Sequence, residues 1–110
     1  MGKITFSAIE FGRDTSWSVG HYRLWFTPEG DLQLSNDNGH VVWQTDTRGD
    51  RLAMQEDGNL AIYSPDGRCI WSTGTHGNSR AFLAAHDDGN LVIYSAQGQR
   101  PLWESRTAGK

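Results

Sequence analysis

Short runs of alternating apolar and polar residues fill most of the chain, and turn residues separate them. Gly, Asp and Asn cluster between these runs, a pattern that is typical of short β-strands joined by tight turns. No apolar repeat of helical period is long enough to compete with strands. The pattern predicts an all-β chain with strands at 22–26, 32–34, 41–45, 52–55, 60–63, 69–73, 81–84, 91–94 and 102–105.

The first 21 residues are less regular than the rest. Ile4–Phe6 is expected to form a short strand and Ser16–Ser18 a further edge strand. The segment Phe11–Asp14 contains a glycine and two charged residues, which favours a turn or loop. We expect residues 1–21 to supply strands that pack on the remainder of the fold.

The other strands belong to three copies of one unit. Gly30, Gly58 and Gly89 follow one another at intervals of 28 and 31 residues, and three tryptophans follow at intervals of 28 and 32 residues. Each of these tryptophans (Trp43, Trp71 and Trp103) begins the sequence Trp-x-(Thr/Ser)-x-Thr. Because two independent markers keep the same period, the repeat is real. We assign the repeats to residues 22–47, 52–75 and 81–107 of a single domain that spans 1–110.

Each repeat holds about three strands, which is too few to bury an apolar face alone. Three repeats can do so by packing around a pseudo-threefold axis, with one tryptophan from each at the centre. A β-trefoil needs four strands per repeat and longer units, and a propeller blade needs more. The repeat length therefore predicts a triangular prism of three small antiparallel sheets.

Composition and charge restrict the function. The net charge of -3 comes from interspersed acidic and basic residues, so nothing points to nucleic acid. No long apolar segment is present, which argues against membrane insertion and a retained signal peptide. We expect a protein that is cytoplasmic or released without a recognisable signal. The single cysteine, Cys69, aligns with Val41 and Pro101 of the other repeats and is expected to be a small packing residue.

Catalytic and metal-binding patterns are missing from the sequence. The four histidines lack the spacing of metal ligands. No nucleophile elbow, phosphate loop or zinc-protease segment occurs. We therefore expect no enzyme, no metal and no cofactor.

Polar side chains gather around the turn of the second repeat. Gln55, Asp57, Asn59 and Tyr63 alternate with apolar residues such as Leu60, so a strand pair places them on the outer face while the apolar set faces the core. Ordinary turn chemistry explains Asp-Gly-Asn. It does not explain why Gln55 and Tyr63 flank the turn. These two additional polar residues indicate a binding site.

The series Gln55-x-Asp57-x-Asn59-x-Ala61-x-Tyr63 resembles the Gln-x-Asp-x-Asn-x-Val-x-Tyr motif of the bulb-type (monocot) mannose-binding lectins. The resemblance covers nearly the whole chain and implies a β-prism II fold, up to three mannose sites and no catalysis. It also implies that Gln55 binds the mannose 3-hydroxyl, Asp57 and Asn59 the axial 2-hydroxyl, and Tyr63 the 4-hydroxyl. Ala61 stands where the family has a valine against the sugar ring.

The same comparison with the family motif predicts how well the other two repeats bind a sugar. The third repeat has histidine where the family has glutamine, and imidazole lacks the paired donor and acceptor of an amide. We expect a weaker site there, formed by His86, Asp88, Asn90, Val92 and Tyr94. The first repeat departs at every motif position and is expected to be inactive; its residues are Thr27, Glu29, Asp31, Gln33 and Ser35.

These observations predict a multivalent lectin for mannose or mannose-rich glycans. The family further implies a homodimer, with exchange of the C-terminal strand as one arrangement; Trp103 would then pack into the partner. Pro101 cannot donate a ladder hydrogen bond, which favours an edge position or an irregular register for that strand. Two alternatives stay open: a bacteriocin-like or defence protein on the same fold, and a prism scaffold that binds protein through degenerate sugar sites.

Overall fold

The computed structural model describes residues 2–110, and every regular element in this part of the chain is a β-strand. The twelve strands are β1 Lys3–Phe6, β2 Ile9–Gly12, β3 Thr15–Val19, β4 Tyr22–Phe26, β5 Leu32–Ser35, β6 Val41–Gln44, β7 Arg51–Met54, β8 Leu60–Tyr63, β9 Cys69–Ser72, β10 Phe82–His86, β11 Leu91–Tyr94 and β12 Pro101–Glu104. Residues 2–110 contain no helix with the length and apolar character that a membrane crossing requires.

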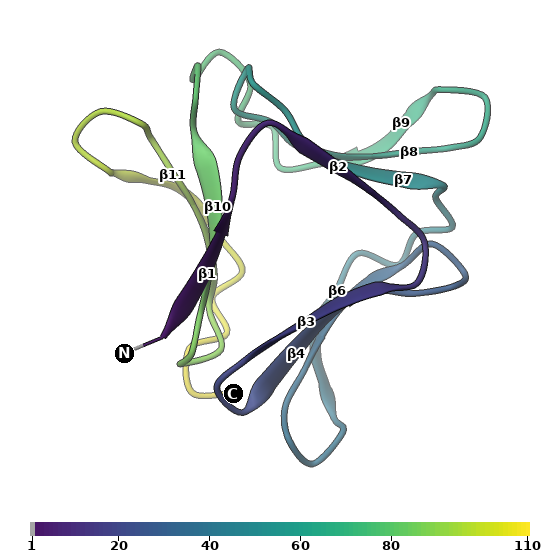
Figure 1. The fold of residues 1–110 in the computed structure, drawn as a ribbon, viewed down its shortest axis with the longest axis vertical. Helices are drawn as coiled ribbons and strands as arrows, with labels where there is room; N and C mark the ends of the chain where they lie inside the picture. The colour runs from purple at the N-terminus through teal and green to yellow at the C-terminus, as the bar shows by residue number, and fades with distance from the viewer. Residues whose placement is uncertain (1) are drawn as a thin grey trace.

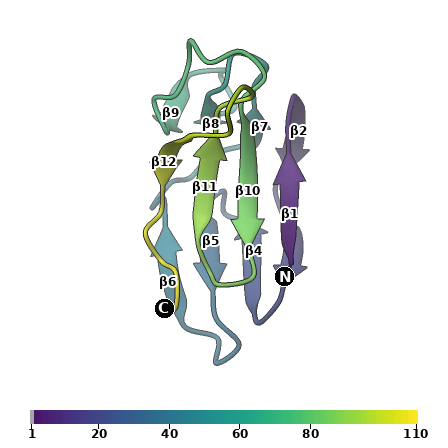
Figure 2. The ribbon, with the colours of Figure 1, turned by 90° about the vertical axis from the view of Figure 1, so that its left-hand side faces the viewer.

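The strands form three antiparallel sheets of four, in the orders β3-β4-β5-β6, β2-β7-β8-β9 and β1-β10-β11-β12. The sheets are the three sides of a triangle (Figure 1), and the strands of one sheet lie side by side along the short axis of the molecule (Figure 2). Neighbouring strands are about 4.8 Å apart, so four of them account for most of the 18 Å thickness. Each repeat supplies three strands, and the N-terminal segment adds the fourth strand to every sheet. The expected all-β prism is confirmed.

Equivalent residues from the three sheets meet on the axis and form layers. The second strand of each sheet contributes a leucine, and the third strand contributes a leucine or isoleucine. These six side chains are buried: Leu24, Leu52 and Leu83, then Leu34, Ile62 and Ile93. Apolar burial of this kind is the main source of stability in a chain with no disulfide.

An aromatic triad closes each end of the core. Trp43, Trp71 and Trp103 contact one another edge to face, with ring centroids 5.6–6.2 Å apart. At the opposite end, the N-terminal strands bring together Phe6, Phe11 and Trp17 at 4.6–5.4 Å. The expectation that one tryptophan from each repeat meets at the axis is confirmed; the three lie at one end of the core and are partly buried.

A β-bulge lets the last strand of each sheet place two neighbouring residues against the core. In the first repeat, Leu34 is opposite Trp43 but Ser35 is opposite Val41, so Val42 is an extra residue. The same shift occurs in the other two sheets. Because a bulge breaks the strict alternation of faces, Val42 packs against the core together with Trp43.

The predicted turn or loop at Phe11–Asp14 is wrong over its first half. Residues 9–12 form β2, in which Phe11 is opposite Leu52 and Gly12 is opposite Arg51. The Phe11 ring packs between Phe6 and Trp17. Pairing with β7 and burial of this ring override the turn preference of the local sequence.

The interpretation of Cys69 as a packing residue is also wrong, because Cys69 is exposed. It is opposite Tyr63, ahead of the bulge, and so lies on the outer face of its sheet. The aligned Val41 is likewise 44% exposed.

The expected edge position of the last strand is confirmed, since β12 ends its sheet and pairs with β11 alone. In this chain β12 completes its own sheet, and Trp103 contacts Trp43 and Trp71 of the same chain. A homodimer that exchanges this strand stays a prediction.

Candidate functional site

The motif of the second repeat lies at the turn between β7 and β8. The backbone N–H of Gln55 donates to the Asn59 carbonyl at 2.9 Å, and that of Gly58 donates to the Gln55 carbonyl at 3.0 Å. Asp57 accepts a hydrogen bond from the Asn59 backbone N–H at 3.0 Å through one carboxylate oxygen. Because the turn is fixed by its own backbone, the exposed Asp57 carboxylate has a defined position.

Gln55 and Tyr63 are joined across the outer face by a hydrogen bond from the Gln55 side-chain amide to the Tyr63 phenol. The bond spans a row of small side chains, because Ala53 and Ala61 lie opposite each other between the two ends of the motif. The Arg51 guanidinium lies over the Tyr63 ring, 4.6 Å from its centre, and stabilises the ring by a cation–π contact. The two motif residues that turn chemistry does not explain are thus a preformed polar pair.

Asn59 has a structural contact as well as a free donor group. Its side-chain oxygen accepts hydrogen bonds from the Thr75 backbone N–H at 3.2 Å and the Thr73 hydroxyl at 3.3 Å. The Thr75 hydroxyl in turn donates to the Gly58 carbonyl at 2.6 Å. These contacts orient the Asn59 amide, so that its NH₂ group is the part available to a ligand.

The same arrangement occurs in all three repeats. Asp31 and Asn90 accept from the backbone N–H of Thr47 and Thr107, both at 3.2 Å. This contact explains the recurring Trp-x-(Thr/Ser)-x-Thr sequence, whose hydroxyl residues tie the end of each repeat to its own turn. Sequence reasoning noticed the pattern and assigned it no role.

Ala61 is 0% exposed, and its expected contact with a sugar stays a prediction. Its counterpart Val92 is only 3% exposed. Both residues lie in the middle row of the outer face, where Ala61 has Ala53 and Ser72 opposite it and Val92 has Ala84 and Glu104. The position forms the floor of the motif rather than its surface.

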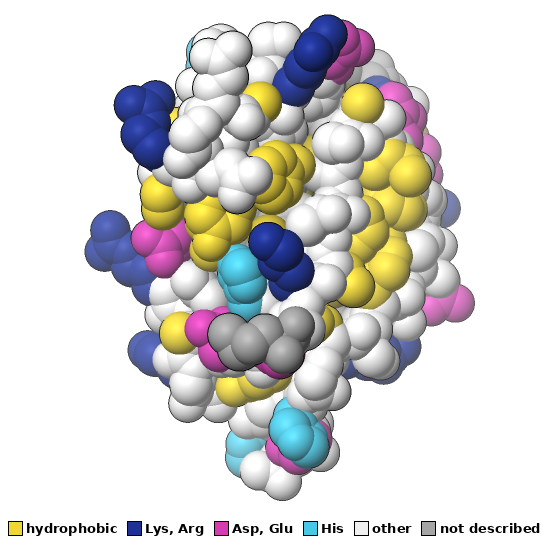
Figure 3. Space-filling view, turned by 60° about the vertical axis from the view of Figure 1, so that its left-hand side comes forward, with side chains coloured by type: hydrophobic (Ala, Val, Ile, Leu, Met, Phe, Trp, Pro, Cys, Tyr) yellow, Lys and Arg dark blue, Asp and Glu magenta, His cyan; other side chains and the backbone are white. Residues whose placement is uncertain are grey.

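In the third repeat a histidine replaces the glutamine of the polar pair. The His86 ring nitrogen Nε2 lies 3.0 Å from the Tyr94 phenol. Asp88 accepts from the Asn90 backbone N–H at 3.0 Å, as in the second repeat. However, the Asn90 side-chain NH₂ donates to the Glu104 carboxylate at 2.9 Å. One of the two N–H donors of this group is therefore engaged here, whereas no hydrogen bond from the Asn59 NH₂ group is found within residues 2–110. Figure 3 shows a histidine on this face with hydrophobic side chains on one side and a basic side chain on another.

In the first repeat, several residues at the motif positions are engaged with one another. Thr27 is buried and its hydroxyl accepts from the Asp31 backbone N–H. Asp31 is engaged through both carboxylate oxygens, one with the Thr45 hydroxyl and one with the Gln33 amide. Trp25 lies in the row where the other repeats have alanine, and its indole N–H donates to Asp14 at 3.1 Å. The indole occupies the face that would otherwise be open.

Sequence reasoning named Gln33, Ala61 and Val92 as motif residues and missed their neighbours in the central row of each outer face. The row is Ser16, Trp25, Gln33 and Gln44 in the first sheet, Glu10, Ala53, Ala61 and Ser72 in the second, and Thr5, Ala84, Val92 and Glu104 in the third. The contrast is visible in the aligned repeats at residues 25, 53 and 84, because an alanine accompanies the motif only where the motif is intact or nearly so.

Comparisons with known proteins agree with this geometry. The structure matches a lectin of Marasmius oreades with a TM-score of 0.85, at 30% identity over 97% of this chain and 92% of that chain. It matches a structure described as a monomeric monocot mannose-binding lectin of Gastrodia elata at 0.82, with 29% identity over 96% and 97%. The lectin of Polygonatum cyrtonema, solved in complex with a monomannoside, matches at 0.74 with 32% identity over 92% and 99%. A scan of protein-family models and a search of curated sequences found no match.

The three-sided fold and the polar cluster on its outer face define a lectin of the β-prism II class. Its identity to solved lectins extends over almost the whole chain. The chain belongs to the bulb-type (monocot) mannose-binding lectin family.

Proposed function

We propose that this protein binds terminal mannose of glycans at the second-repeat site and acts by recognition, without catalysis. The observation that carries the proposal is the hydrogen-bonded pair Gln55 and Tyr63 beside the oriented side chains of Asp57 and Asn59. The names of the Gastrodia and Polygonatum lectins, which describe mannose binding and a bound mannoside, support it.

The site chemistry suits a fixed pattern of sugar hydroxyls. Gln55 donates to the phenol oxygen of Tyr63, so the phenol hydrogen remains available for a sugar hydroxyl. Asp57 provides an acceptor and Asn59 a donor at the turn, a combination that fits the axial 2-hydroxyl of mannose. A glucoside carries this hydroxyl equatorially and would leave Asp57 without its partner, at a cost of about 1–3 kcal/mol.

One such site is expected to be weak. A few net hydrogen bonds of about 0.5–1.5 kcal/mol each correspond to millimolar affinity. Strong attachment to a glycan-covered surface then requires several sites on one rigid body. The third-repeat site supplies one of them, and the predicted homodimer would supply more.

Tyr63→Phe is the variant that tests the second-repeat site. We expect affinity for methyl α-mannoside to fall about tenfold or more, because Gln55 loses its partner and the sugar loses a donor. Titration followed by NMR measures this affinity, and methyl α-glucoside serves as the epimeric control ligand. Tyr94→Phe is the matched control and should reduce total binding less. Unchanged mannoside binding by Tyr63→Phe, or equal binding of the two epimers, would show the proposal to be wrong.

Glu104→Ser is predicted to strengthen the third-repeat site. Serine is the residue at the equivalent position of the second repeat, Ser72, and it would release the Asn90 amide from Glu104. In a Tyr63→Phe background, mannoside affinity should rise about two- to tenfold, the equivalent of one net hydrogen bond. Gln44→Ser makes the corresponding change in the first repeat and should have no effect. Equal responses to both substitutions would refute the role given to Glu104.

A further inference from the structure

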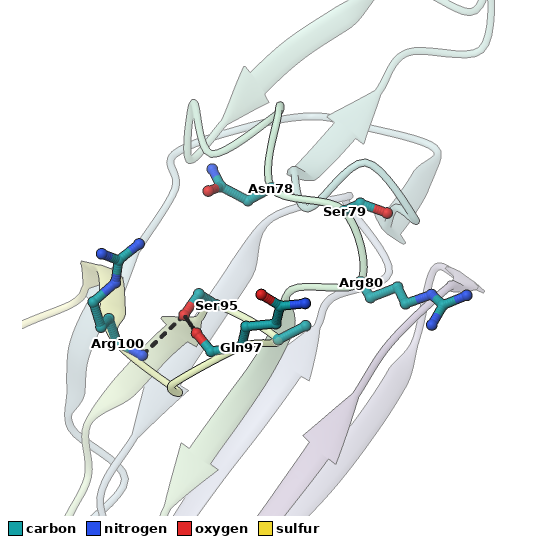
Figure 4. A pocket seen from close by; sticks show the side chains of 7 residues that line it. Asn78, Ser79, Arg80, Ser95, Gln97 and Arg100 are labelled. Atoms are coloured by element: carbon teal, nitrogen blue, oxygen red, sulfur yellow. Dashed lines mark hydrogen bonds between the residues drawn. The ribbon is translucent and has the colours of Figure 1, made fainter.

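A hollow of about 670 Å³ lies apart from the three motif positions, between the segment 76–80 and the turn 95–100. Figure 4 shows it from close by, with Arg100 and Gln97 on one side, Asn78 on the other and Arg80 at the edge. Its polar lining comes from Asn78, Ser79 and Arg80 of the first segment and from Ser95, Gln97 and Arg100 of the second.

The hollow forms where the third repeat departs from threefold symmetry. Leu83 follows Thr75 by eight residues, whereas the equivalent Leu52 follows Thr47 by five. The outer turn is also longer by one residue, since seven positions separate Tyr94 from Pro101 and six separate its equivalents in the second repeat. Both added segments are walls of the hollow, so this site has no counterpart elsewhere in the chain's three repeats.

Internal hydrogen bonds hold both walls in place. On one side, the backbone N–H groups of Asn78 and Arg80 donate to the carbonyls of Asp57 and Glu56 at 2.9 and 2.8 Å. On the other side, the Ser95 hydroxyl accepts from the Arg100 backbone N–H at 3.0 Å and donates to the Gln97 carbonyl at 2.7 Å. The hollow is preformed, and one wall is attached to the turn that carries the second-repeat site.

The charge in the hollow is positive although the protein is acidic overall. No carboxylate lines it, and none of the ion pairs found within residues 2–110 involves Arg80 or Arg100. By contrast, Arg13 and Arg51 are paired with Asp50 and Glu10. Exposed guanidinium groups beside amide and hydroxyl groups suit a ligand that combines an oxyanion with several hydroxyls.

We propose that this hollow is a second saccharide site, which takes a sugar unit bearing a carboxylate or a sulfate group. Arg100 binds the oxyanion, with Arg80 at the rim adding positive charge. The Asn78 NH₂ group donates to the Thr75 carbonyl at 2.9 Å, which fixes the amide, so its side-chain oxygen and the Gln97 amide bind ring hydroxyls. The site is separate from the mannose site and does not depend on it, and a glycan with both kinds of unit could occupy the two together.

The test compares three sugars. Methyl α-glucuronide carries a carboxylate, glucose 6-sulfate carries a sulfate, and methyl α-glucoside is neutral. Each is titrated into the full chain at low salt, and NMR follows the side-chain amides of Asn78 and Gln97. We expect an anionic sugar to shift these amides at concentrations where the neutral sugar has no effect. Binding of one anionic sugar and not the other identifies the group as carboxylate or sulfate.

Two substitutions that each remove one positive charge distinguish binding in the hollow from unspecific electrostatic attraction. Arg100→Gln should weaken binding of the anionic sugar about tenfold or more. Arg68→Gln removes the same charge at the equivalent position of the second repeat, in a turn without the inserted residues, and should leave binding nearly unchanged. Tyr63→Phe should also leave it unchanged while it weakens mannoside binding.

Three results would overturn the proposal. The first is an equal loss in Arg68→Gln and Arg100→Gln, which would indicate unspecific electrostatic attraction. The second is competition by inorganic sulfate at the same concentration as the sugar, which would indicate an ion site only. The third is failure of every anionic sugar to shift the Asn78 and Gln97 amides.

Discussion

Trp71→Ala is expected to lower the free energy of unfolding by about 3–5 kcal/mol. The Trp71 ring contacts Trp43 at 5.8 Å and Trp103 at 6.2 Å between centroids, at the point where all three sheets meet. Its removal leaves a cavity and deprives both partners of an edge-to-face contact. A domain of this size has about 5–15 kcal/mol of stability in total, so the variant should unfold at much lower denaturant concentration.

Trp25→Ala is the control for this prediction. Trp25 lies half-buried on the outer face, where it contacts the Arg23 guanidinium at 4.3 Å and Asp14. Its loss should cost about 1 kcal/mol. Urea unfolding followed by circular dichroism compares the two variants. Equal destabilisation would mean that the triad stabilises the fold no more than a side chain on the outer face does.

Gly58→Ala is the second substitution with a large expected effect. Gly58 has φ of +94°, and a Cβ atom there would lie 2.2 Å from the Asn78 carbonyl oxygen. A left-handed conformation costs a side chain about 1–2 kcal/mol, and the clash with rigid backbone adds about 1–3 kcal/mol. The turn carrying Asp57 and Asn59 must move to relieve it. We therefore expect lower stability together with loss of mannoside binding.

Gly67→Ala is the control that distinguishes the effect of the steric clash from the effect of the positive φ angle. Gly67 has a similar φ of +86°, but a Cβ atom there would meet nothing within 4 Å. This variant should lose only about 1–2 kcal/mol and bind mannoside normally. Thermal unfolding and NMR titration of both variants measure the difference. Similar losses of stability and binding in the two would contradict the role of the contact between Gly58 and Asn78.

The repeats show how one scaffold can carry three different surfaces. The contact between residue 31, 59 or 90 and the closing hydroxyl segment is preserved in every repeat, because each turn needs it. Side chains on the outer face do not take part in this hydrogen bond and can therefore differ between repeats. Trp25 closes this face in the first repeat, and Glu104 engages the Asn90 amide in the third. The position of Asp31, Asn59 and Asn90 therefore has a structural role in every repeat, in addition to the recognition role proposed for Asn59.

Local physics explains what the sequence by itself determined. Alternation of apolar and polar residues defines strands, Asp-Gly and Asn-Gly pairs define turns, and a period of about 28 residues shared by glycine and tryptophan defines the threefold prism. The candidate site at Gln55, Asp57, Asn59 and Tyr63 lies within nine consecutive residues, so its parts could be found together in the sequence.

Only the tertiary structure decided the features that join distant segments. Pairing with β7 makes a strand of residues 9–12 despite their turn composition. The register between β11 and β12 brings Glu104 to Asn90, fourteen residues away. The hollow between 76–80 and 95–100 exists because two insertions meet in space. In each case the outcome depends on strand register and on which segments become neighbours, and neither is encoded in the local pattern of any one stretch.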